Sequence, residues 1–371
     1  MSNRKNVGQH RDSNIELYRI ICMLLIVAHH YVVNSGLMAI DGPIQENPTS
    51  WQSIFLLLIG AWGKTGINCF VFITGWFMSN SRITFTKFVK LFTEVFFYII
   101  VIFCVFSVSG YEPFSFGGFV KTIIPYISIK DGFTSCFLVY YIAIPFLNIL
   151  MDNLDEKKHR CIILLVSFIY IALGSIHKVA MNYFTWFIVL HLIAGLIRRY
   201  PKDVYEKKNI WGIISFFSLI LSCASVIAMV YLSGKYGFNG KYYLFVQDVN
   251  TLLPVITGIS SFLFFKNLNM GYCSIINVIA SSTFGVLLIH ANSDTMRRWL
   301  WQDVLNNVGM YSSDLLVVHV IGSVIGVFIV CTLIDQIRII LLEKPFISWW
   351  IKHEEGLVEG LRKRKPFAYF M

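Results

Sequence analysis

The feature that most constrains this chain is a series of long apolar runs with very few charged residues between or within them. Apolar residues make up 56% of the sequence and charged residues only 14%, and the mean hydropathy is +0.65. A soluble chain of this length carries about a quarter charged residues, because its surface must be solvated. Most of this surface must therefore face hydrocarbon. The sequence predicts an all-α, polytopic bundle of transmembrane helices.

The apolar runs set the expected number of spans, because a helix needs about 20 apolar residues to cross a bilayer. We expect about ten spans on this criterion, at roughly 15–34, 52–78, 88–109, 133–151, 160–176, 183–199, 210–233, 244–265, 273–292 and 315–342. Segment 111–130 is aromatic and semi-polar, which leaves an interfacial helix there as an open alternative. The first run lacks a small-residue cleavage site, so we expect it to stay as a membrane helix.

Lysine and arginine are unevenly distributed among the segments that separate these runs. If the amino terminus is cytoplasmic, most of them fall on the inside, as the positive-inside rule requires. We therefore expect one membrane domain, 1–371, with both termini cytoplasmic: a short tail at 1–14 and a basic tail at 343–371. The net charge of +10 then serves orientation and contact with anionic lipid, and we do not expect nucleic-acid binding.

Several kinds of functional site have no signature in the sequence. The eight cysteines lie mostly in apolar runs and form no C-x-x-C pair, which favours small buried residues over a disulfide or zinc framework. No nucleotide-binding glycine fingerprint is present, and no span holds a His or Glu pair with metal-ligand spacing. We expect no metal, and any chemistry must use residues within the membrane and in short loops.

Ionisable side chains inside the predicted spans are candidates for function, because each costs roughly 2.5–3.5 kcal/mol to insert. They are Glu16, Arg19, His29, His30, Lys64, Glu94, His191, Asp248, His290, His319 and Asp335.

The first predicted helix carries Arg19 and His30, eleven positions apart. Eleven residues make three helical turns plus about 20°, so both side chains project from one face, about 16 Å apart along the axis. His29 points about 100° away from His30 and is less suited to share its role. The alternatives are that Arg19 is a snorkelling anchor and that His30 is a packing residue.

These residues resemble the signature of the membrane acyltransferase family 3, the R-x10-H acyltransferases. Arg19 and His30 match the motif and its spacing. Three further segments are similar to family segments and occur in the same order: GINCFVFITG at 66–75, FLVYYIAIPFL at 137–147 and STFGVLLIH at 282–290. The resemblance covers nearly the whole chain and includes the ten-span layout.

The chain also departs from the family pattern. Thr74 stands where the family has a serine, and the stretch beginning at Ser135 lacks the acidic residues of the W-S-L-x-V-E-E subset. We see no fused hydrolase-like domain. The sequence therefore resembles the stand-alone branch that O-acetylates envelope glycans. That resemblance implies transfer of acetyl from cytoplasmic acetyl-CoA to a hydroxyl of an envelope polysaccharide or lipid-linked sugar, in a multi-pass protein of the inner or plasma membrane. It leaves a homo-oligomer open.

The resemblance also suggests roles for basic residues near the expected cytoplasmic face. Arg binds phosphate well through its forked donors, so Arg19 would hold the acyl-CoA, together with Arg82, Lys87 and Lys90. For the last three residues, the alternative is that they only orient the helices.

The remaining candidates would act at the reacting groups. His30 would be either a general base on the acceptor hydroxyl or a transient acyl carrier. Lys64 would stabilise the oxyanion or bind the acceptor, unless it snorkels outward. Glu94 would orient an imidazole or pair with Lys90, and His290 would bind the acceptor or lie at the interface.

A transporter or flippase of a glycan-lipid or small solute is the main alternative class. Ten spans with a few buried charges would suit one. Against it, the sequence shows no internal repeat, and Pro145 and Pro254 are isolated rather than paired in two broken helices.

Overall fold

The computed structural model describes residues 12–81, 84–123, 132–236 and 240–362, which form helices and loops without a strand among them. By length and composition, six helical stretches in these ranges could cross a membrane, or seven if one bent pair counts as a span. The protein is thus an all-helical, multi-pass type of chain, as predicted. The count of ten spans and the cytoplasmic termini stay predictions.

The six stretches are α1 (Ser13–Val33), α3 with α4 (Trp51–Gly60 and Gly63–Met78), α5 (Phe85–Val108), α7 (Phe133–Asp152), α10 (Lys208–Tyr236), and α15 (Leu316–Arg338) continued by the π-turn η5 (Ile339–Glu343) into α16 (Lys344–Arg362). The bent pair has α12 (Ser274–Ser281) and α13 (Thr283–His290) as its first arm, and α14 (Asp294–Arg298) and η4 (Trp299–Val304) as its second.

The other elements are shorter than the six stretches, and one of them, α9, has the same bounds as the span predicted at 183–199. They are α2 (Pro43–Glu46), α6 (Phe116–Ile123), α8 (Glu156–Ser167), η2 (Phe168–Ala172), α9 (Tyr183–Arg199), η3 (Asp203–Glu206) and α11 (Leu252–Lys266). Turns occupy 244–251, so the run predicted at 244–265 becomes helical only from Leu252. Within 111–130, where the sequence leaves an interfacial helix as an open alternative, residues 116–123 form the helix α6, and residues 124–131 lie outside the described ranges.

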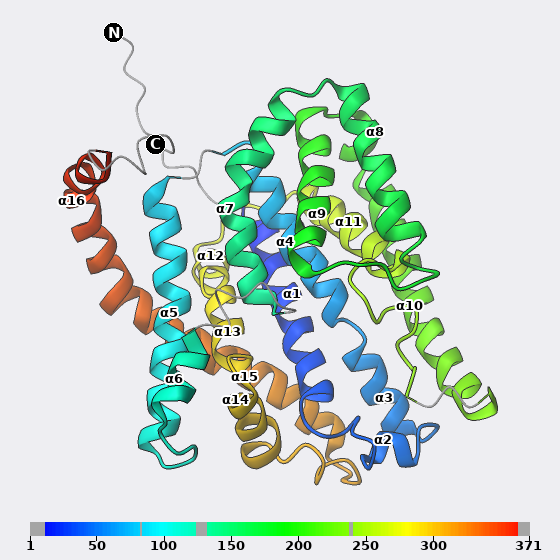
Figure 1. Cartoon of the computed structure of the whole chain (residues 1–371). Helices are drawn as coiled ribbons and strands as arrows, with labels where there is room; N and C mark the ends of the chain where they lie inside the picture. The colour runs from blue at the N-terminus through cyan, green and yellow to red at the C-terminus, as the bar shows by residue number, and fades with distance from the viewer. Residues whose placement is uncertain (1–11, 82–83, 124–131, 237–239, 363–371) are drawn as a thin grey trace.

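Helix α1 runs through the middle of the bundle, as Figure 1 shows, and packs against α3, α4, α11, α12, α13 and α15. Its first turn is tied to the end of α11, where the Asn14 amide lies 3.0 Å from the carbonyl oxygens of both Phe265 and Lys266. The amino end of α1 and helix α16 lie toward the same end of the bundle in Figure 1.

Two glycines allow α4 to lie close against α1. A Cβ on Gly66 would come within 2.9 Å of Ile26 Cγ1 and 3.1 Å of the Cys22 carbonyl oxygen. A Cβ on Gly63 would come within 2.3 Å of the His29 ring. Neither position has room for a larger residue without a shift. The close approach of the two helices brings Lys64, the residue after Gly63, to the carboxyl half of α1.

The run predicted as one span at 273–292 is interrupted. Ser282, with φ −97° and ψ 0°, separates α12 from α13, and its N–H bonds to the Ile279 carbonyl rather than continuing the α-helical pattern. After His290 the chain turns by 96° into α14 and η4. This geometry leaves His290 at the carboxyl end of a short helix and folds α14 back beside it.

Candidate active site

The last turn of α1 and the end of α13 bring two histidines into contact. His30 Nδ1 lies 2.9 Å from His290 Nε2, although the residues are far apart in the chain. His290 is fully buried, and its other ring nitrogen, Nδ1, lies 2.6 Å from the Val286 carbonyl oxygen one turn earlier. The two rings therefore form one hydrogen-bonded chain that ends on the backbone of α13.

The directions of these hydrogen bonds follow from the carbonyl, which can only accept. With neutral rings, His290 must carry its proton on Nδ1 and donate it to Val286. His290 Nε2 is then an acceptor, so His30 donates from Nδ1. The lone pair of His30 is left on Nε2, which is the nitrogen that a general base or an acyl carrier would use.

His30 lines a cavity of about 660 Å³ between α1, α4, α5, α7, α9, α13 and α14. Its polar lining includes Lys64 on α4, Tyr183 at the start of α9, and Asp294 and Arg297 on α14. The Lys64 Nζ donates to the Tyr183 hydroxyl at 2.7 Å and lies 5.3 Å from the centre of that ring. Lys64 thus faces the protein interior on the His30 side rather than extending outward to the membrane surface.

Arg297 supplies a second cation to this cavity. Its guanidinium donates to Asp294 Oδ1 at 2.9 Å and to the Ala291 carbonyl at 3.3 Å. Arg297 is not among the candidate residues that the sequence pointed to. Its position after the 96° turn, which folds α14 back toward His30, carries no local sequence signal.

His29 also lines the cavity, but its contacts are with the junction between α3 and α4. Its Nδ1 lies 2.5 Å from the Gly60 carbonyl oxygen, to which it must donate. Its ring packs directly over Gly63. His29 therefore supports the helix break that precedes Lys64, while its neighbour His30 contacts His290.

Arg19 lies at the other end of α1, three turns from His30, and is not among the residues that line the His30 cavity. Its Nε is 3.6 Å from Glu16 Oε2, and a quarter of its side chain is exposed. The structure thus confirms the helix that separates the two residues and does not bring them together. Arg82 lies outside the described residues.

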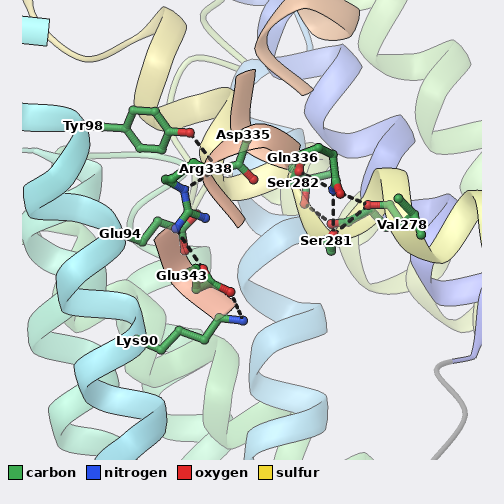
Figure 2. A network of polar contacts seen from close by, with 12 residues as sticks. Lys90, Glu94, Tyr98, Val278, Ser281, Ser282, Asp335, Gln336, Arg338 and Glu343 are labelled. Atoms are coloured by element: carbon green, nitrogen blue, oxygen red, sulfur yellow. Dashed lines mark hydrogen bonds and ion pairs between the residues drawn. The ribbon is translucent and has the colours of Figure 1, made fainter. Parts of the chain in front are cut away.

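Two of the other predicted site residues, Lys90 and Glu94 on α5, belong to a separate cluster, shown in Figure 2. Lys90 Nζ pairs with Glu343 at 2.6 Å, and Glu94 pairs with Arg338 at 3.2 Å. Neither side chain lines the His30 cavity, and Lys87 is exposed on the same helix. The partner of Glu94 is thus an arginine on α15 rather than an imidazole or Lys90, which lies one turn away on its own helix.

Arg338 is the centre of this cluster. Its guanidinium contacts three carboxylates, because Nε lies 2.8 Å from Asp335 and Nη1 lies 2.8 Å from Glu343. Asp335 Oδ1 also accepts from the Tyr98 hydroxyl at 2.7 Å, whereas its Oδ2 is buried without a hydrogen-bond partner in the described part of the chain. No group of three or more potential metal ligands occurs among the residues that the structure describes.

Comparison with known proteins gives one match. A family model described as an acyltransferase domain covers residues 12–335, which includes Arg19, His30 and His290. No curated protein and no solved structure matches the chain.

Proposed function

The chain belongs to the membrane acyltransferase family 3, and we propose that it transfers acetyl from cytoplasmic acetyl-CoA to a hydroxyl of an envelope polysaccharide or lipid-linked sugar. Membership makes it a membrane acyltransferase. The donor, the acceptor and the inner or plasma membrane as its location are parts of the proposal. The observation that carries the mechanism is that His30, whose Nε2 has no hydrogen-bond partner among the described residues, lines a cavity that also holds two cations.

In this mechanism His30 acts as a general base. As the acceptor oxygen attacks the thioester carbonyl, Nε2 removes the hydroxyl proton. A C–O bond forms and the C–S bond breaks, and the proton passes from Nε2 to the leaving thiolate to give free coenzyme A. His290 Nε2 holds the Nδ1–H of His30 throughout and so fixes the ring's tautomer and orientation.

The alternative role of His30 as an acyl carrier uses the same nitrogen. Nε2 would attack the thioester and release coenzyme A, and the acceptor hydroxyl would then take the acetyl from the imidazole. The base mechanism needs no second group to accept the hydroxyl proton, and for that reason we favour it.

Lys64 is placed to stabilise the oxyanion that forms on the thioester carbonyl. Its ammonium has three donors, of which one bonds Tyr183. Inside a protein a fixed cation stabilises developing negative charge more than it does in water.

The donor has to approach from the end of α1 that carries Arg19. About 16 Å along the helix separates Arg19 from His30, which is comparable to an extended pantetheine arm. Phosphates held at Arg19 would therefore allow the thioester to reach His30. Lys87 and Arg82 stay candidates for the same site, while Lys90 is a weaker one because Glu343 pairs with it.

The proposal is tested by following the acetyl group from donor to acceptor. Membranes containing the full chain are supplied with labelled acetyl-CoA, and label in envelope glycan is measured for the native protein, for His30→Ala and for His177→Ala, a matched variant at an exposed loop histidine. We expect His177→Ala to retain transfer and His30→Ala to lose it by about 10²–10⁴-fold, the usual contribution of a general base. Equal incorporation by both variants would overturn the mechanism. Solute movement without any incorporation would favour a transporter.

A further inference from the structure

The break between α12 and α13 leaves the Val278 carbonyl without the backbone N–H that a continuous helix would bring to it, and this carbonyl accepts from side chains instead, one of them the Ser281 hydroxyl at 2.7 Å. In such a helix the N–H of Ser282 would bond to the Val278 carbonyl, but here it bonds to Ile279 instead. A side chain from another helix takes that place. Gln336 of α15 lies with its Nε2 2.9 Å from the Val278 carbonyl oxygen (Figure 2).

Gln336 also reaches the serines at the break. Its Nε2 is 3.0 Å from Ser281 Oγ and 2.7 Å from Ser282 Oγ. An amide nitrogen has two hydrogens, so it can serve two of these three acceptors at once. Because Ser282 is the single residue between the two helices and is fully buried, the amide fixes the point at which α13 begins.

Asp335, the residue before Gln336, packs against the first turn of α13. A Cβ on Gly285 would lie 2.3 Å from Asp335 Cγ, so the carboxylate packs directly on the glycine backbone. Asp335 is itself held by the Tyr98 hydroxyl of α5 and by Arg338. Helix α13 is therefore located by α15, and through Asp335 by the buried cluster around Arg338.

The position of the short helix α13 determines where His290, and with it His30, is held. Val286, the residue after Gly285, provides the carbonyl that orients His290, and His290 in turn bonds His30. With eight residues, α13 has little length over which to absorb a displacement at its start. A shift of about 1 Å in such a constellation can reduce a rate by about 10²-fold.

We propose that Gln336 and the Asp335–Gly285 contact are positioning elements for His290, and through it for His30. This inference rests on the proposed function. It assigns to α15 a part in catalysis although neither Asp335 nor Gln336 lines the His30 cavity.

Gln336→Met tests the inference, because methionine keeps the length of the side chain and removes its donors. We expect the variant to lower the turnover for acetyl transfer by about 10- to 100-fold, with little change in the KM for acetyl-CoA and in the thermal midpoint. Gln302→Met, at an exposed glutamine of η4, is the matched control and should retain full activity.

The decisive comparison repeats Gln336→Met in a His290→Ala background. If Gln336 acts through His290, adding Gln336→Met to the His290→Ala protein should not lower the turnover further. The ratio of the two turnovers should then be about 1. The same loss in both backgrounds, or no loss in either, would overturn the positioning role and leave the proposed function intact. Full activity of His290→Ala alone would contradict the positioning role, because His30 would then work without His290, and would leave the proposed acetyl transfer itself intact.

If Gln336→Met does not fold, Ser282→Ala provides a milder form of the test. This variant removes one acceptor of the amide and leaves the other two in place. We expect a smaller loss that again disappears in the His290→Ala background, and a loss that persists there would contradict the proposal.

Discussion

His30 and its neighbour His29 differ in what their ring nitrogens contact. Both nearby imidazoles with a backbone partner, His29 and His290, donate Nδ1–H to a carbonyl, whereas His30 donates to a ring nitrogen and keeps Nε2 for the cavity. Helical periodicity was enough to select His30 over His29 in the sequence. It could not supply His290 as its partner, because that contact joins residues 260 positions apart.

A prediction for a single residue concerns Lys64. Replacing it by methionine removes the cation beside His30 while keeping the chain length. We expect turnover to fall by about 10²–10³-fold, as for loss of an oxyanion donor, with Lys64→Arg retaining part of the activity. Lys235→Met is the control, since Lys235 also lies over a tyrosine ring, but at the exposed end of α10. Equal rates for Lys64→Met and the control would assign Lys64 to packing alone.

The approach of α1 and α4 can be tested through Gly63. A Cβ there collides with the His29 ring at 2.3 Å, so Gly63→Ala should lower the thermal midpoint. Removing the ring should relieve the collision. We therefore expect the double variant Gly63→Ala/His29→Ala to be destabilised by less than the two single changes together. Additive losses, measured by thermal unfolding in detergent, would show that the contact is not the cause.

The cluster at Arg338 contains three carboxylates and two cations, all within the interface of α5, α15 and η5. Arg338→Met removes the shared partner of Glu94, Asp335 and Glu343, and we expect it to cost roughly 3–5 kcal/mol of stability. Asp335→Asn removes one negative charge from a cluster in which carboxylates outnumber cations, and Asp335 Oδ2 has no hydrogen-bond partner within the described ranges.

We therefore expect Asp335→Asn to lower the thermal midpoint much less than Arg338→Met. A cost for Asp335→Asn as large as that for Arg338→Met would mean that the charge of Asp335 is required.

Apolar run length predicted some helices well and others poorly, for identifiable reasons. It located α1, α5, α10 and α15, whose runs are uninterrupted. It failed at Ser282 and after His290, where the chain breaks or turns within an apolar stretch. The choice between a straight span and a bent one depends on contacts from elsewhere, such as the Gln336 amide, which hydropathy does not register.

For the whole molecule, the distribution of Lys and Arg predicts which face is cytoplasmic. The loop after α7, at Asn153, should be inside, and the loop at His177 should be outside. With Cys104 and Cys161 replaced by serine, a membrane-impermeant thiol reagent should label His177→Cys in intact cells and label Asn153→Cys only after permeabilisation. The reverse pattern would invert the predicted orientation.

The central claim is that the Nε2 of His30 performs acyl transfer inside the membrane domain. The most direct measurement is the rate of coenzyme A thiol release by the purified protein in vesicles, with acetyl-CoA and a hydroxyl acceptor present, for the native chain and for His30→Ala. The predicted result is release at least about 100-fold slower in His30→Ala, with an unchanged thermal midpoint. Equal rates of release by the two proteins would contradict the claim.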